Sequence, residues 1–248
     1  MSNSPNTSRL VHLSGRLVPE AEATISIFDS AVMLGDTVTE SSRTFNHKPY
    51  RLEQHIQRLY RSLKVARIDP GISAEEMLSR THELLETNLT TTRAEDDVWI
   101  VHNISRGLSR PCPDPTQKHP ATIMIFTDHL DLRGWARYYD EGCHAVTPPS
   151  RIVPSQSLDA RIKNRSRLSY TLADQEARLV DPDAQCVILD IHGNVAENKG
   201  GNIFCVRDGE ILTPTTGNCL AGESRATVLE LAAQLGLQAR EQLLQPYD

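Results

Sequence analysis

Two stretches in the first half of the chain repeat their apolar residues at helical spacing. The stretch SAEEMLSRTHELLETNL opens with Ser73 and has Glu76 three residues later, which is a capping box. The stretch RLEQHIQRLYRSLKVA places its apolar residues on one face of a helix: Leu52, Ile56, Leu59, Leu63 and Ala66. We predict that both stretches are helices and that the helix formed by RLEQHIQRLYRSLKVA lies on a sheet.

Strand signals follow these helices and dominate the second half of the chain. The stretch DVWIVHNIS alternates and is rich in β-branched residues, and ATIMIF and CHAVT are also typical of strands. The long segment CVILDIHGNVAENKGGNIFCVRDGEILT contains the turn pairs Gly193-Asn194 and Asp208-Gly209 between apolar runs. These pairs predict a series of hairpins.

The segment PCPDPTQKHP, residues 111–120, contains four prolines and can continue neither a strand nor a helix. We therefore predict an N-terminal domain over 1–112, a linker over 113–120 and a C-terminal domain over 121–248. Helices and strands mix without strict βαβ alternation, which favours an α+β fold in two lobes. Two further helices are predicted in the second lobe, at about 166–180 and 223–235.

Composition narrows the class of protein. The chain has 248 residues, a net charge of −6 and five widely spaced cysteines without a C-x-x-C pair. A protein that coats nucleic acid is disfavoured by this charge, and neither a disulfide framework nor a metal site is indicated. Because no apolar stretch is long enough to span a bilayer and the start is polar, we expect no membrane segment, no secretion and a cytoplasmic location. The first eight or so residues are predicted to be a loose tail.

Four residues could carry chemistry, although each has an ordinary structural explanation. Lys163 lies among arginines, which would lower the pKa of its amine, but a loop lysine is usually solvated. Ser224 opens an amphipathic helix whose start could bind an anion or be merely capped. Glu197 ends a hairpin strand and Arg58 lies at the edge of a helix face, and each would be a surface residue if taken singly. Together they match what pyridoxal phosphate needs, which is an amine, an anion site and an acid beside the pyridine nitrogen.

The sequence resembles the fold type IV family of pyridoxal-phosphate enzymes, which includes branched-chain and D-amino-acid aminotransferases, (R)-amine transaminases and aminodeoxychorismate lyases. Five motifs carry this resemblance in order: ISIFDSAVMLGDTVTE, RLEQHIQRLYRSL, IKNRSRLSYTLADQEA, GNVAENKGGNIFCVRDGEILTP and LAGESRATVLELA. It implies a small N-terminal α/β domain, a larger barrel-like C-terminal β domain with helices, and a homodimer. It also implies that Lys163 is the Schiff-base lysine and that Glu197 faces the pyridine nitrogen. The remaining cofactor-binding residues it implies are Arg58, Asn202, Glu223 and Ser224.

Several positions depart from the family pattern. Thr39 stands where transaminases usually carry Phe or Tyr, and Glu223 puts an acid beside the phosphate. Arg167 occupies a position where several lyases have arginine, whereas Glu40 matches the aminotransferases better. The chain also stops before a last segment that family members possess, so we expect a shortened relative or an incomplete sequence.

The leading functional prediction is a transaminase that moves an amino group from an amino acid or amine to a 2-oxo acid, with Lys163 as the catalytic base and acid. Arg167 keeps open the alternative of an aminodeoxychorismate lyase that releases 4-aminobenzoate and pyruvate. A non-catalytic protein with this fold is a third possibility. Predicted substrate-side residues are Thr39, His102, Arg106, Arg110 and Arg167. For His102, Arg106 and Arg110 the competing explanation is a solvated strand end.

Overall fold

In the computed structural model, residues 9–114 and 116–248 are described, so the predicted N-terminal tail lies outside the described residues. The chain divides into two compact units. The first comprises the residues up to Asp131 together with Lys163–Ser166, and the second comprises Leu132–Ile162 and Arg167–Asp248. Each unit is described by itself below.

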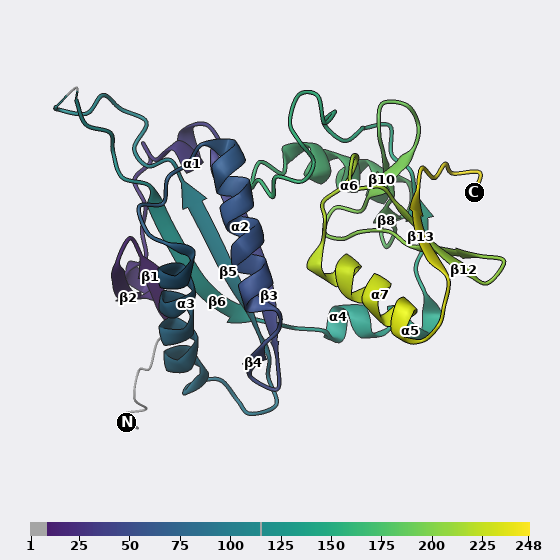
Figure 1. Cartoon of the computed structure of the whole chain (residues 1–248), viewed down its shortest axis with the longest axis horizontal. Coiled ribbons are helices and arrows are strands. Elements are labelled where there is room, and N and C mark those ends of the chain that lie inside the picture. Colours follow the sequence, from purple (N-terminus) through teal and green to yellow (C-terminus); the bar gives the residue numbers. More distant parts are fainter. Residues whose placement is uncertain (1–8, 115) are drawn as a thin grey trace. The chain divides into compact units, whose positions relative to one another are not determined.

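The first unit is built on a six-stranded antiparallel sheet with strand order β2-β1-β6-β5-β3-β4 (Figure 1). Short elements, the 3-10 turn η1 (Glu20–Glu22) and helix α1 (Ser30–Met33), connect β2 to β3. The strands are β1 (Leu10–Leu13), β2 (Arg16–Pro19), β3 (Thr37–Phe45), β4 (Lys48–Pro49), β5 (Val98–Ser105) and β6 (Thr122–His129).

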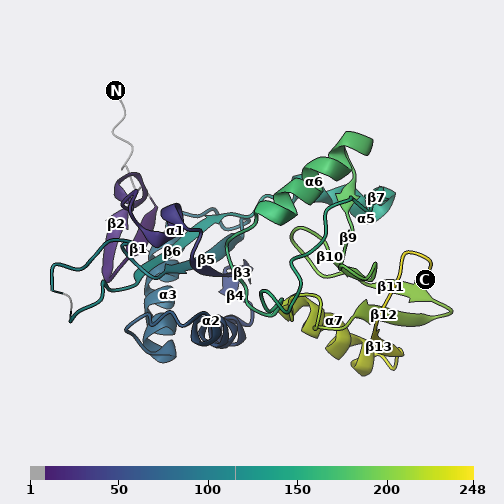
Figure 2. The same cartoon turned by 90° about the horizontal axis from the view of Figure 1, so that it is seen from above.

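Helices α2 (Leu52–Ala66) and α3 (Ala74–Leu89) lie side by side on one face of this sheet (Figure 2). As predicted, α2 buries its apolar stripe, including Leu59 and Leu63, and Ser73 caps α3 by accepting a hydrogen bond from the Glu76 N–H. The helices therefore determine which face of each strand points into the core.

Strand β3 alternates between these two faces. The Glu40 side chain bonds to residues of α2, so its neighbour Thr39 points to the face without helices. The same rule applies to β5, where His102 contacts α3 and Asn103 lies on the opposite face. Thr39 and Asn103 therefore share the helix-free face of the sheet.

The domain boundary differs from the predicted linker at 113–120. Strand β6 pairs along its length with β5 and belongs to the first unit, which continues to Asp131. The proline-rich segment therefore connects two neighbouring strands of one sheet. Strand β5 ends at Ser105, before this segment begins, and the chain returns to the same sheet after it.

The second unit combines helices with three small sheets, ordered β10-β9, β11-β12-β13 and β7-β8. Both predicted hairpins form, and Asp208 and Gly209 adopt the positive φ angles of a tight turn. Its elements are α4 (Arg133–Ala136), α5 (Tyr138–Glu141), β7 (Ala145–Val146), α6 (Leu168–Val180), β8 (Gln185–Cys186), β9 (Ile188–Leu189), β10 (Val195–Glu197), β11 (Cys205–Arg207), β12 (Glu210–Pro214), α7 (Glu223–Gln234) and β13 (Ala239–Gln242).

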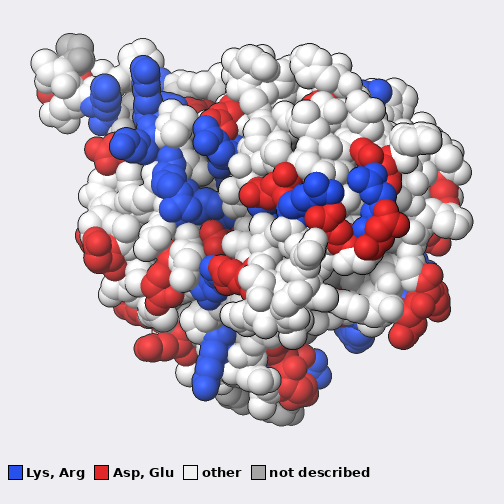
Figure 3. Space-filling model, turned by 45° about the vertical axis from the view of Figure 1, so that its right-hand side comes forward, with Lys and Arg blue, Asp and Glu red and all other residues white. Residues whose placement is uncertain are grey.

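Surface charge is mixed in sign. Acidic and basic side chains lie close together over much of the face shown in Figure 3, consistent with a modest net charge of −6. Within residues 9–114 and 116–248, no helix has both the length and the apolar character needed to cross a membrane.

Candidate active site

Lys163 is attached to the first unit by backbone hydrogen bonds on both sides. Its carbonyl oxygen accepts from the Thr39 N–H at 2.8 Å, and its own N–H donates to Ser62 Oγ on α2 at 3.2 Å. The Arg165 N–H donates to the Thr37 carbonyl, also at 2.8 Å, so residues 163–165 pair antiparallel with the edge of β3. The predicted reactive lysine is therefore held between a strand and a helix, although it comes from a loop.

Arg58 lies buried on α2 and is paired with Glu40 on β3. Arg58 Nε donates to Glu40 Oε2 at 2.8 Å, and Nη2 donates to Oε1 at 2.6 Å. His55 Nδ1 lies 2.9 Å from the same Oε1. Both members of the ion pair are almost fully buried, with Glu40 0% and Arg58 5% exposed, so the guanidinium has a fixed orientation.

The surroundings of Glu40 determine its charge. Burial would raise the pKa of this carboxyl group, but the hydrogen bonds from His55 and Arg58 and the positive charges of Arg58 and Lys163 lower the pKa to about 2. Glu40 is therefore a carboxylate at neutral pH and faces both Arg58 and Lys163.

Glu197 ends strand β10 in the second unit and is 5% exposed. Its Oε1 accepts a hydrogen bond from the Tyr170 hydroxyl at 2.5 Å, and its Oε2 accepts from the Leu220 N–H at 3.0 Å. Burial and the Glu197 carboxylate raise the pKa of the Tyr170 phenol, so the phenol keeps its proton and remains a donor. This carboxylate is oriented in advance and suits a partner that carries an N–H.

Arg167 belongs to the same group of side chains as Glu197. Its guanidinium carbon lies 3.6 Å from the centre of the Tyr170 ring, and Nη2 donates to the Lys199 carbonyl. These contacts place the Arg167 guanidinium against the Tyr170 phenol, which in turn donates a hydrogen bond to Glu197. Arg167 thus has a structural explanation that does not require lyase chemistry.

Helix α7 begins at Glu223 directly after Gly222, and no side chain caps its N-terminus. A Cβ atom on Gly222 would lie 2.1 Å from Asn202 Oδ1, and Asn202 Nδ2 donates to the Leu220 carbonyl at 2.8 Å. The close packing of Asn202 therefore requires glycine before the helix. The exposed Ser224 hydroxyl follows in the first turn, where the helix dipole favours an anion.

The other predicted substrate residues lie in different surroundings. His102 is fully buried and its Nε2 lies 2.9 Å from Thr81 Oγ1 on α3. Burial lowers the pKa of its imidazole to about 4. His102 lies on the helix-covered face of the sheet and Thr39 on the opposite face, and a substrate contact for His102 stays a prediction. Thr39 itself donates to the His102 carbonyl at 3.0 Å, which leaves its methyl group for the helix-free face.

Arg106 and Arg110 lie at the end of β5. Arg106 binds both carboxylate oxygens of Asp36, at 2.7 and 3.2 Å, and donates to the carbonyls of Ala66 and Arg67 at the end of α2. Arg110 lies over the ring of Phe28. Both arginines line a hollow of about 670 Å³ in the first unit. Arg106 is thus part of the scaffold, and a substrate contact for Arg110 stays a prediction.

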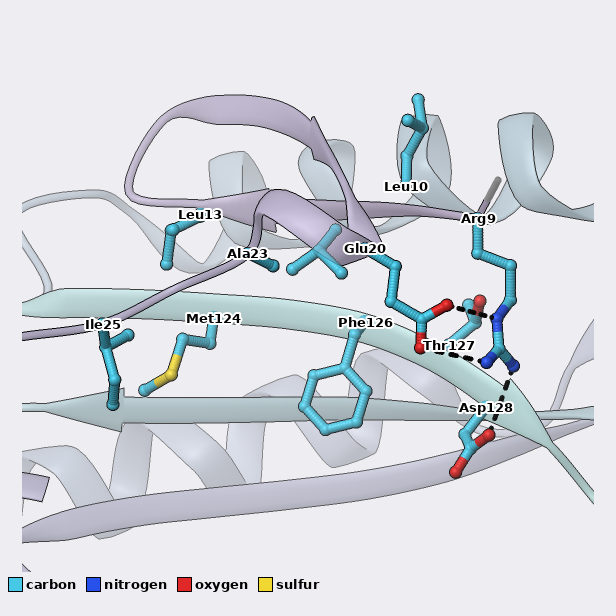
Figure 4. A pocket seen from close by; sticks show the side chains of 11 residues that line it. Arg9, Leu10, Leu13, Glu20, Ala23, Ile25, Met124, Phe126, Thr127 and Asp128 are labelled. Carbon is cyan, nitrogen blue, oxygen red and sulfur yellow. Dashed lines mark hydrogen bonds and ion pairs between the residues drawn. The ribbon is translucent and has the colours of Figure 1, made fainter. Parts of the chain in front are cut away.

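A second hollow, of about 300 Å³, lies over strands β1 and β6 (Figure 4). Met124 and Phe126 contribute to its apolar lining, and at one end Arg9 bridges Glu20 and Asp128. None of the predicted site residues lines it.

Three contributors were not assigned a role from the sequence: Glu40, His55 and Tyr170. His55 and Arg58 are three residues apart on one helix and so share a face, a signal that could have suggested a common partner. Tyr170 gave no such signal, because its contact with Glu197 joins distant parts of the sequence.

The residues present fit pyridoxal phosphate in kind. The first unit offers a lysine and a buried guanidinium, and the second offers a buried carboxylate and a helix start without a side-chain cap. An amine, two types of anion-binding group and an acid for the ring nitrogen are the donor set that the cofactor requires.

Comparison with known proteins agrees with this chemistry. A family model described as Amino-transferase class IV matches residues 37–248. The chain is 31% identical over 240 residues to a putative branched-chain-amino-acid aminotransferase of Methanocaldococcus jannaschii, covering 96% of this chain and 80% of that protein.

Two solved structures are similar over most of the chain. One is the branched-chain aminotransferase from Thermoproteus uzoniensis with norvaline, with a TM-score of 0.84, 28% identity and coverage of 97% of this chain and 80% of that one. The other is the T.th. branched-chain amino acid aminotransferase with pyridoxamine 5′-phosphate, with a TM-score of 0.86, 25% identity and coverage of 97% and 78%.

Proposed function

The chain belongs to the class IV aminotransferase family, and from this premise we propose that its amino donors are branched-chain amino acids and its acceptors 2-oxo acids. It is a pyridoxal-phosphate-dependent aminotransferase with the α+β architecture of fold type IV, as its resemblance predicted. The branched-chain donor is supported by the names of the relatives at 25% identity or more. Neither the comparisons nor the contacts of Arg167 favour the lyase.

The cofactor, when bound, supplies a carbonyl that reacts with amines and a pyridine ring that withdraws electrons. We propose that Lys163 Nζ is the amine that attaches it. Once the substrate amine has replaced it, the same Nζ carries the proton that leaves the substrate α-carbon. The backbone contacts of Lys163 with Thr39 and Ser62 fix where this amine originates.

We propose that residues of the second unit bind the ring nitrogen and the phosphate of the cofactor. Glu197, oriented by Tyr170 and Leu220, accepts the hydrogen bond of the protonated ring nitrogen. The first turn of α7 with Ser224 donates to the phosphate, and Asn202 supports that turn through the Leu220 carbonyl. Arg58 in the first unit adds positive charge for the same phosphate.

The observation that carries this proposal is the family match over residues 37–248, which includes the lysine and the acid. It is tested by recording the visible absorbance of the purified holoprotein, reducing it with borohydride and locating the modified residue. We expect the label on Lys163 and expect Lys163→Ala to abolish amino transfer from leucine, isoleucine or valine. Full activity in that variant would overturn the assignment.

A panel of amino donors tests the substrate class. Branched-chain L-amino acids should give the highest kcat/KM, with consumption of the 2-oxo acid acceptor. A donor preference for D-amino acids or (R)-amines would replace the proposed substrate and leave the reaction type intact. Release of pyruvate from aminodeoxychorismate without an acceptor would instead support the lyase.

We also propose a homodimer, on the basis of the family resemblance. Analytical ultracentrifugation of the holoprotein should give twice the mass of one chain. A mass equal to one chain at micromolar concentration would contradict this proposal.

A further inference from the structure

We propose that Glu40 and Ser62 are positioning residues for the amino transfer, holding Arg58 and Lys163 in one preformed frame whose negative charge faces Lys163. This inference rests on the proposed function, because it assumes that Lys163 is the reacting amine. It assigns work to two residues that belong to neither of the expected catalytic and cofactor-binding sets.

The frame begins on α2. Arg58 and Ser62 are four residues apart on this helix, so their side chains lie on the same face one turn apart. Both are buried, at 5% and 3% exposure. Arg58 Nε and Nη2 bond to Glu40, while Ser62 Oγ accepts the N–H of Lys163 at 3.2 Å. One turn of α2 therefore carries Arg58 and, through Ser62, binds the backbone of Lys163.

Strand β3 completes the frame from the other side. Glu40 follows Thr39, whose N–H donates to the Lys163 carbonyl at 2.8 Å. The chain of contacts runs from Lys163 through Ser62 and Arg58 to Glu40, and returns through Thr39 to Lys163. Every link lies in the first unit.

The charges within this frame are balanced. Oε1 of Glu40 also accepts from the Ser41 N–H at 2.9 Å, besides His55 and Arg58, so the carboxylate is held by several donors. The titratable or charged groups around it in the first unit are Arg58, His55, Lys163 and His102. Its charge offsets that of Arg58, so Lys163 does not face an isolated buried cation.

The expectation that neighbouring arginines lower the pKa of the Lys163 amine stays a prediction, and Glu40 with its partner Arg58 adds a further charged pair in the same unit. Arg161 is bound to Asp159 by two side-chain bonds, and Arg167 contacts Tyr170 in the second unit. Within its own unit, Lys163 interacts electrostatically with Glu40, which is paired with Arg58, and Arg165 lies two residues further along the chain.

The first test is Glu40→Gln, which keeps the shape of the side chain and removes its charge. Without the carboxylate, Lys163 faces the uncompensated charge of Arg58, which disfavours a protonated amine. We expect the midpoint of the pH titration of the visible absorbance to fall by about one pH unit or more. Glu53→Gln on the first turn of α2 is the matched control, because Glu53 is exposed, and it should leave the midpoint unchanged.

An unchanged midpoint in a Glu40→Gln protein that still binds the cofactor would overturn the electrostatic part of the proposal. Circular dichroism and the thermal midpoint show whether the variant folds. A wild-type protein that binds the cofactor but transfers no amino group would contradict the proposed function and leave this titration test valid.

The second test, Ser62→Ala, covers the case in which Glu40→Gln does not fold. It removes only the acceptor of the Lys163 N–H, so we expect the dissociation constant for pyridoxal phosphate to rise about tenfold with little change in the thermal midpoint of the apoprotein. Ser62→Thr, which restores a hydroxyl group, should recover part of the affinity. Equal affinity in Ser62→Ala and wild type would refute the frame, as would a loss that Ser62→Thr does not reduce.

Discussion

Tyr170 donates its hydroxyl hydrogen to Oε1 of Glu197 at 2.5 Å, while the Arg167 guanidinium lies over the phenol ring. Tyr170 belongs to α6 and Glu197 to β10. Their bond fixes a buried carboxylate, which also accepts a hydrogen bond from the Leu220 N–H. Hydrogen bonds to the charged form of an acid stabilise that form. Tyr170 therefore fixes the position of the Glu197 carboxylate, the proposed partner of the ring nitrogen.

Replacing Tyr170 by Phe should lower kcat several-fold to tenfold while cofactor binding is largely kept. The variant loses one of the two donors that orient Glu197, and leaving a buried acceptor without its donor costs about 1–3 kcal/mol. Tyr60→Phe is the control, because the Tyr60 hydroxyl also donates a hydrogen bond, here to backbone carbonyl oxygens, but lies in the first unit. Equal effects of both variants would contradict a specific role for Tyr170.

Gly222→Ala should weaken cofactor binding more than it weakens the fold. Its new methyl group would meet Asn202 Oδ1 at 2.1 Å, so either the Asn202 side chain or the start of α7 must move. Because the helix start is the proposed phosphate site, we expect at least a tenfold rise in the dissociation constant for pyridoxal phosphate, measured by absorbance titration. Gly217→Ala has no contact closer than 4.0 Å and should be nearly neutral. Similar affinities for both variants would count against this helix start as the phosphate site.

Arg106→Ala should reduce stability by about 1 kcal/mol and leave donor selectivity unchanged. The side chain is 48% exposed, so its ion pair with Asp36 contributes modestly, and its bonds to the Ala66 and Arg67 carbonyls stabilise the end of α2. Chemical denaturation and a donor panel measure the two quantities, with exposed Arg61→Ala as the control. A large rise in the donor KM at unchanged stability would restore the substrate role predicted from the sequence.

Local signals in the sequence were sufficient for much of the fold. The helix at 52–66, the Ser73 cap and the turn at Asp208-Gly209 each depend on a few adjacent residues, and all three are present. The order of the motifs was sufficient for the family. These features are encoded by periodicity and by capping or turn chemistry, which act over short distances.

Features that depend on tertiary contacts could not be predicted in the same way. The proline-rich segment was interpreted as a domain linker because nothing local shows that β5 and β6 pair across it. His102 was placed near the substrate because strand alternation alone does not say which face the helices cover. The ion pair of Glu40 with Arg58 joins β3 to α2, so its existence depends on how these elements pack.

His102 should lower the unfolding free energy of the protein at acid pH. The folded pKa of about 4 lies below the ordinary value of 6.5, because burial disfavours the charged imidazolium. Between these two pH values the unfolded chain binds a proton at this position and the folded chain does not. The contribution of neutral His102 to the unfolding free energy is therefore fully present above pH 6.5 and is lost as the pH falls toward 4. The loss attributable to His102 is about 3 kcal/mol at most. His102→Gln should therefore flatten the pH dependence of the unfolding free energy in this window, measured by urea denaturation, whereas His82→Gln on α3 should not. Parallel curves for wild type and His102→Gln would show that His102 does not cause the acid sensitivity.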